Sequence, residues 1–140
     1  MGNMMGKDRT FSAADAKGGQ DINPKTTAVL CIEFQNEFTT DGEGDKKGKL
    51  YDGVKGVMES TGMLDKSVDV CAATRSAGGK VFHAPITFAA DNSDNPNKSL
   101  GILAGCAKDG LFKTGSWNAE FCEKMTPQDG DVRNPCVHFT

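Results

Sequence analysis

An uninterrupted apolar run from Ala28 to Ile32 constrains the fold of this chain more than any other stretch. The run contains β-branched residues and does not alternate, which predicts a strand buried on both faces of a parallel sheet. The sequence then turns polar at Glu33, Gln35 and Asn36. Ligands of open parallel sheets bind outside the carboxyl ends of the strands. We therefore expect the Glu33 carboxylate to lie where this core strand meets the binding crevice.

A helix and a second strand follow and complete a βαβ unit. The stripe expected to face the sheet recurs at helical spacing and consists of Leu64, Val68, Cys71, Ala72 and Arg75. Arg75 ends the stripe, and its guanidinium is expected in water. Gly78 and Gly79 are typical of a helix C-terminus. Lys80–Phe88 predicts the second strand, with Pro85 at its end or at a bulge. Strand, helix and strand indicate an α/β protein with a right-handed crossover.

The rest of the chain predicts weaker elements. A short helix is expected at Val54–Met58, a helical turn at Leu100–Cys106, and a helix at Trp117–Met125. Thr126–Val132 is typical of the turn before a third strand. That strand is not expected to form, because residues 133–140 contain a proline and then the sequence stops.

Length and charge narrow the class of protein. A chain of 140 residues fits one domain. The net charge of −3 argues against nucleic acid or an anionic membrane as a partner. The five cysteines are irregularly spaced without a CxxC pair, and no signal peptide precedes them, which indicates reduced thiols in a cytoplasmic protein. Residues 1–25 are polar and aperiodic and predict a flexible arm.

Six segments occur along the chain in the order IEFQNEF, KLYDGV, RSAGG, VFHAPITF, GSWNAEF and MTPQDGD. Together they resemble the isochorismatase-like cysteine hydrolases, over residues 26–132. The resemblance implies a three-layer, Rossmann-like α/β fold around a parallel sheet with flanking helices, incomplete here in its C-terminal half, with residues 133–140 as a divergent tail. It also implies a Cys–Asp–Lys triad that acts on a small amide, imide or vinyl ether, and no cofactor.

The resemblance assigns Glu33 to the acid position of the triad, with Gln35 and Asn36 as neighbours that bind substrate. Glutamate in place of aspartate moves the carboxylate one methylene further out. The triad lysine has no counterpart. Arg133 cannot replace it, because a guanidinium does not give up a proton near neutral pH. Phe38 is a further candidate for substrate binding.

Cys136 lies in a segment, Asn134 to Thr140, that resembles the family's nucleophile turn. Three explanations are open: an unrelated tail from a premature stop or misjoined gene model, the true nucleophile turn with the intervening segment skipped, or a natural short protein. Trp117 and Phe38 either line an apolar pocket over the crevice or belong to the core. The chain offers no Asp-x-His after the second strand, so no metal site is expected.

Two functions from different classes follow. The first is a family hydrolase for a small molecule, truncated and weakly active or inactive, with Glu33 and Cys136 as the catalytic candidates. The second is a non-catalytic α/β binding or interaction module. In the family's strand order, loss of the C-terminal half leaves the first strand with an unpaired edge. Such an edge favours a homo-oligomer or aggregation, and a cooperatively melting monomer would contradict that expectation.

Overall fold

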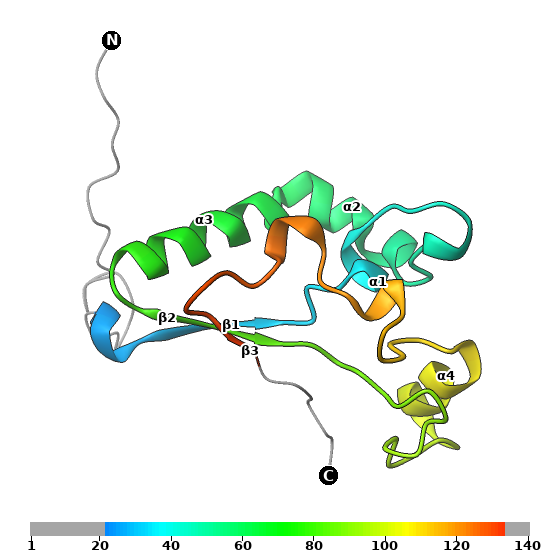
Figure 1. Ribbon diagram of the computed structural model, residues 1–140. Coiled ribbons are helices and arrows are strands. Elements are labelled where there is room, and N and C mark those ends of the chain that lie inside the picture. The colour runs from blue at the N-terminus through cyan, green and yellow to red at the C-terminus, as the bar shows by residue number, and fades with distance from the viewer. Residues whose placement is uncertain (1–21, 134–140) are drawn as a thin grey trace.

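The computed structural model describes residues 22–133, in which helices connect three strands (Figure 1). The strands are β1 (Ala28–Ile32), β2 (Lys80–Ala84) and β3 (Val132–Arg133). The α-helices are α1 (Asn36–Thr39), α2 (Tyr51–Thr61), α3 (Met63–Ser76) and α4 (Gly101–Asp109). Short 3-10 turns occur at Pro24–Thr26, Gly44–Lys46, Trp117–Ala119 and Glu123–Met125. Residues 1–21 and 134–140, which hold most of the predicted arm and the predicted tail, lie outside the described residues.

The three strands form one parallel sheet in the order β1-β2-β3. Ala28 pairs with Lys80 and Ile32 with Ala84, so β1 and β2 are in register along their whole length. The predicted α/β class, a parallel sheet with flanking helices, is confirmed. The expectation that no third strand forms is wrong, because Val132 pairs with Phe82. The second strand is shorter than predicted and ends at Ala84, since Pro85 has no N–H to donate to a neighbouring strand.

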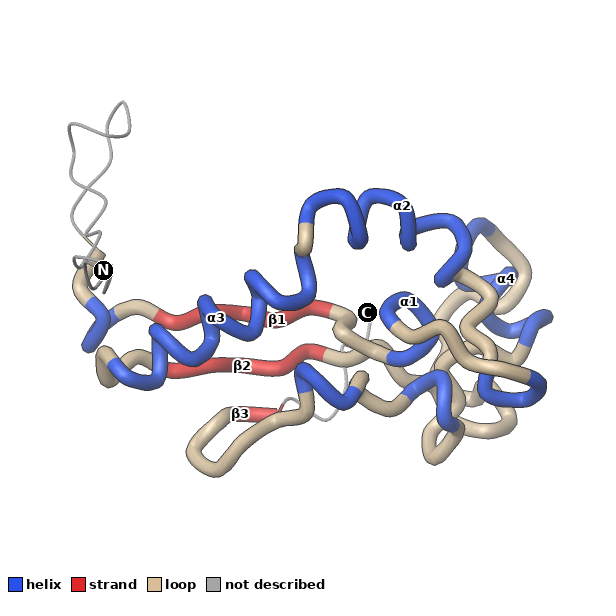
Figure 2. Tube along the Cα trace, turned by 90° about the horizontal axis from the view of Figure 1, so that it is seen from above, coloured by secondary structure: helices blue, strands red, loops and turns tan. Residues whose placement is uncertain are grey.

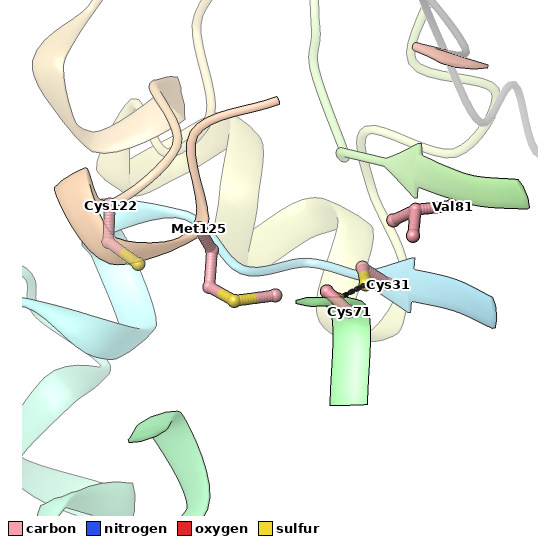
Figure 3. Close-up of a cluster of buried hydrophobic side chains, with 5 residues drawn as sticks. All are labelled: Cys31, Cys71, Val81, Cys122 and Met125. Atoms are coloured by element: carbon pink, nitrogen blue, oxygen red, sulfur yellow. Dashed lines mark hydrogen bonds between the residues drawn. The ribbon is translucent and has the colours of Figure 1, made fainter. Parts of the chain in front are cut away.

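Helix α3 crosses β1 and β2 on one face of the sheet, and α2 continues beyond it on the same side (Figures 1 and 2). Cys31, Cys71 and Val81 are buried between the helix and the sheet, together with Cys122 and Met125 (Figure 3). On the other face, Leu30 and Ile32 are 58% and 56% exposed. The prediction that this strand is buried on both faces is therefore wrong. The described helices that pack on β1 cover only the face of Cys31, since side chains alternate between faces along a strand.

Within the described residues, β1 is an edge strand. Its pairing with a second copy of the chain through that edge stays a prediction. The stripe on α3 is confirmed at Leu64, Val68 and Cys71, which join the core, whereas Ala72 is exposed.

The segment from Trp117 to Met125 is not the predicted helix but two separate 3-10 turns. Its backbone bonds instead to the stretch that follows β1. The N–H of Cys122 donates to the Phe34 oxygen at 3.0 Å, and the N–H of Asn36 donates to the Glu120 oxygen at 2.9 Å. Because these partners lie more than 80 residues away in the sequence, local pattern could not predict them.

A buried ion pair fastens the turn before β3 to α3. The Arg75 guanidinium donates to both carboxylate oxygens of Asp131, at 2.8 and 2.7 Å. The Nε2 atom of His83, on β2, lies 3.0 Å from the same carboxylate. The prediction that the Arg75 head lies in water is wrong, because Asp131 supplies a bidentate partner that a stripe on one helix does not reveal.

Candidate functional site

Glu33 lies immediately after β1, at the carboxyl end of the sheet, as the sequence predicts. Its backbone has φ of +60°, which is the left-handed region that favours glycine. The Glu33 N–H donates to the Ala84 oxygen at 3.0 Å, and its carbonyl accepts from the Gln35 N–H at 2.8 Å. A left-handed glutamate costs about 1–2 kcal/mol, and such strain clusters at functional sites. The turn at Glu33 directs the chain away from the sheet at the residue that carries the carboxylate.

Two cavities meet at Glu33. One, of about 410 Å³, lies against α4 and is lined mainly by apolar side chains, among them Phe38, Ile86, Leu103, Leu111 and Phe112. The other, of about 400 Å³, lies against α2 and is also mainly apolar. Glu33 and Phe38 line both cavities. The structure therefore brings these two predicted site residues together.

The Glu33 carboxylate is half-buried, and it forms no ion pair with any other residue in the part of the chain that the structure describes. Among residues 22–133, no donor is hydrogen-bonded to its oxygens. Burial away from water therefore raises the pKa of Glu33 above its ordinary value, because the charged form loses hydration. A carboxyl group with a raised pKa is better matched to proton transfer near neutral pH than an ordinary one.

Replacing Glu33 by glutamine is expected to leave the melting temperature unchanged or higher at pH 7. Glutamine has no charge to bury, whereas the folded state of the natural protein must ionise Glu33 at a raised pKa. The advantage should vanish as the pH falls to about 4.3, the ordinary pKa of glutamate, where the unfolded chain also becomes protonated. Circular dichroism melts at both pH values measure it, with the exposed Glu123→Gln as the control. A larger loss of stability at pH 7 than at pH 4 would contradict the burial argument.

The side chain of Gln35 connects the segments around the site through hydrogen bonds. Its side-chain amide is fully buried and donates to the oxygens of Ile86 and Ala119 at 2.8 and 2.7 Å. Its own side-chain oxygen accepts from the Ile86 N–H at 2.9 Å. The amide is thus used by the protein itself, and it joins the turn after β1 to the segments after β2 and α4. We assign Gln35 a positioning role, and direct contact with a substrate stays a prediction.

Asn36 and Trp117 lie together, but on a different cavity of about 450 Å³. The Asn36 amide donates to the Trp117 oxygen at 2.9 Å and accepts from the Thr40 hydroxyl at 2.7 Å. Phe38, by contrast, packs at 5.4 Å between ring centroids against Phe112, on the Glu33 side. The predicted substrate-binding residues therefore divide between two places, and Phe38 is the one that shares a cavity with Glu33.

Two further buried groups near the site are not predicted by the sequence pattern. Glu37 is fully buried, where one carboxylate oxygen accepts from the Leu50 N–H at 2.9 Å and the other from the Asn118 amide at 3.1 Å. Cys106, on α4, lines the same cavity as Glu33. Burial, and then the negative charge of Glu33, raise the pKa of Cys106. It is therefore held as a thiol and is poorly suited to act as a nucleophile.

Two further residues of the sequence analysis, the nucleophile candidate Cys136 and the excluded Arg133, lie at or beyond the end of the described chain. Cys136 is outside the described residues. Arg133 is the last residue of β3, and its guanidinium stacks over the Phe121 ring at 5.0 Å. Within residues 22–133, no group of three or more His, Cys, Asp or Glu side chains is arranged to hold a metal ion. Nor does any helix in this part of the chain have the length and hydrophobicity to cross a membrane.

Comparison with known proteins finds a family and several relatives that match most of this chain. The family model for the isochorismatase domain matches residues 27–135. Two ureidoacrylate amidohydrolases RutB from Caulobacter vibrioides, strains ATCC 19089 and NA1000, are each 27% identical over 131 residues. These alignments cover 80% of this chain and 52% and 50% of the relatives. The chain thus spans about half the length of the curated relatives it matches.

Two solved structures are similar in fold. An isochorismatase family protein from Desulfovibrio vulgaris subsp. vulgaris str. Hildenborough has a TM-score of 0.58 at 22% identity, over 78% of this chain and 51% of that one. A cysteine hydrolase from Pseudomonas syringae pv. phaseolicola 1448A has a TM-score of 0.55 at 23% identity, over 80% of this chain and 46% of that one. Both support the parallel α/β architecture described above.

Proposed function

This chain belongs to the isochorismatase family, and from that premise we propose that it acts on a small amide by cysteine nucleophilic catalysis. In this proposal Glu33 is the site carboxylate, Cys136 is the nucleophile, and Phe38 contacts the substrate. The observation that carries it is the position of Glu33 at the carboxyl end of β1, strained, half-buried and bordering two apolar cavities. The similarity to amidohydrolases favours an amide as the reacting group.

The charged residues of the cavity against α4 favour an uncharged or cationic substrate. Glu33 and Asp109 are the two ionisable carboxyl residues that line it, and no lysine or arginine is among its described lining residues. Lys49 lies at its border, where its ammonium donates to the main-chain oxygen of Asp109 at 2.7 Å. An anionic substrate would meet negative charge in an apolar cavity, where repulsion is screened less than in water. A neutral amide with an apolar body avoids that cost.

The alternative function is a small-molecule binding module without turnover. It is favoured by Cys106, because the thiol beside Glu33 is held protonated. The same cavities would then serve for binding alone.

Benzamide and ureidoacrylate, one neutral and one anionic, separate these possibilities. We expect the full chain to release ammonia from benzamide faster than from ureidoacrylate. Cys136→Ala should lower the benzamide rate at least about 100-fold, since no other group supplies the nucleophile. Glu33→Gln should also lower it, while the exposed carboxylate control Asp45→Asn should not. Benzamide binding by calorimetry without ammonia release, weakened by Glu33→Gln, would favour the binding module.

A further inference from the structure

The buried thiols of Cys31 and Cys71 form a pair that the proposed reaction does not use. Cys31 is on β1 and Cys71 is on α3, and their Sγ atoms are 3.4 Å apart (Figure 3). Both side chains are almost fully buried, with 3% and 2% exposure. Cys122 belongs to the same core cluster but lies apart from the pair (Figure 3). The protein thus places two sulfur atoms in direct contact across its helix–sheet interface.

A cavity of about 390 Å³ opens beside this pair and is lined by both cysteines. Its walls are mainly apolar, with side chains such as Val29, Phe34 and Val70, and Lys66 is its charged lining residue. The cavity gives a small uncharged reagent a route to thiols that the solvent does not reach directly.

We infer that Cys31 and Cys71 are an oxidative modification site, at which a hydroperoxide converts the two thiols into a disulfide joining β1 to α3. One cysteine, once deprotonated to the thiolate, attacks the peroxide and the O–O bond breaks, which gives a sulfenic acid; the hydroxide that leaves takes up the thiol proton and departs as water. The second thiol then attacks that sulfur, the S–OH bond breaks, and a second water leaves. The two thiols together lose two hydrogen atoms, and one peroxide is reduced.

The two sulfur atoms are already in contact. A disulfide needs an S–S distance of about 2.05 Å, so the sulfur atoms must approach by roughly 1.4 Å. Burial, and then the hydrogen bond with Cys71, raise the pKa of Cys31 to about 12. The thiolate is therefore scarce at neutral pH, and the reaction should accelerate as the pH rises. Because Cys31 precedes Glu33 by two residues, the link would also restrain the strand end that presents the site carboxylate.

Peptide mapping of the folded, full chain tests this inference. The reduced protein is treated with hydrogen peroxide at about pH 8, alkylated with iodoacetamide and digested with trypsin. We expect one peptide containing Cys31 to be linked to one containing Cys71. The link should be absent in Cys71→Ser and retained in Cys106→Ser. The linked protein should melt on the order of 10 °C higher, because the bridge closes a long loop, and dithiothreitol should reverse the shift.

Three results would overturn the inference. The first is full alkylation of Cys31 and Cys71 after peroxide treatment. The second is a disulfide that preferentially joins other cysteines. The third is a Cys31–Cys71 link that forms only once urea has unfolded the chain. None of these results bears on amide hydrolysis, which is assayed with the reduced protein.

Discussion

Replacing Asp131 by alanine is expected to lower the free energy of unfolding by about 3–5 kcal/mol, the loss typical of breaking a buried ion pair. The Asp131 side chain is 2% exposed and its partner Arg75 is 24% exposed. Alanine would leave that guanidinium without its bidentate acceptor. It would also remove the acceptor of the Gln128 N–H, at 2.9 Å, and the bonding partner of His83 Nε2. The Nδ1 atom of that histidine already has no partner in the described chain, so both ring nitrogens would then be unpaired.

Urea denaturation measures this loss, and Asp65→Ala is the matched control. Asp65 also forms an ion pair, with Lys124, but its side chain is 73% exposed. Exposed pairs contribute little because water screens the charges. We therefore expect the control to unfold at the same urea concentration as the natural protein. Equal midpoints for the two variants would show that the buried pair does not stabilise the fold.

The same pair predicts a dependence of stability on acid. Hydrogen bonds from Arg75, the largest cause, hold the pKa of Asp131 well below its ordinary value. When a carboxyl group has a lower pKa in the folded state than in the unfolded chain, its charged form stabilises the fold. This contribution is fully present above the pKa of the unfolded chain, about 3.9. That contribution is lost as the pH falls below this value, so Asp131→Ala and the natural protein should converge in stability under strong acid.

Replacing Gln35 by alanine is expected to lower the free energy of unfolding by about 3 kcal/mol or more. The change leaves three buried backbone groups without partners, namely the Ile86 oxygen, the Ile86 N–H and the Ala119 oxygen. Each unpaired buried group costs about 1–3 kcal/mol. The substitution also leaves a cavity, which adds to the loss.

Gln128→Ala is the control, since it removes the same atoms from an exposed side chain. It should leave the urea midpoint unchanged. Gln35→Glu adds a second comparison, because a carboxylate keeps the acceptor for the Ile86 N–H but loses both donated hydrogen bonds. We expect it to be destabilised as well. If Gln35→Ala unfolded at the same urea concentration as the natural protein, the Gln35 amide would not hold these segments together.

Local patterns predicted the elements that depend on neighbours in the sequence. The apolar run of β1, the strand that begins at Lys80 and the position of Glu33 at a strand end follow from composition and order alone. The left-handed conformation of Glu33 did not, since most residues with that backbone are glycines. Helical spacing near Trp117 was misleading, because its backbone groups bond to residues that the pattern does not include.

The site was predictable only in part for the same reason. The Glu33 carboxylate and Phe38 are close in sequence and share their cavities. Cys106, which faces the same space, is brought there by a long connection after β2 that has no regular pattern. Arg75 and Asp131 are separated by 56 residues, so their contact exists only in the folded chain.

The distance in sequence between these partners also means that the ribosome synthesises them at different times. His83 leaves the exit tunnel 48 residues ahead of Asp131, the carboxylate that both it and Arg75 require. At about 5–20 residues per second, the interval is roughly 2–10 s. During this interval the nascent βαβ unit carries the Arg75 guanidinium and the His83 imidazole without the Asp131 carboxylate that pairs with them. The nascent chain should therefore become resistant to protease only after Asp131 has left the exit tunnel. Folding of this domain is then expected late in its synthesis.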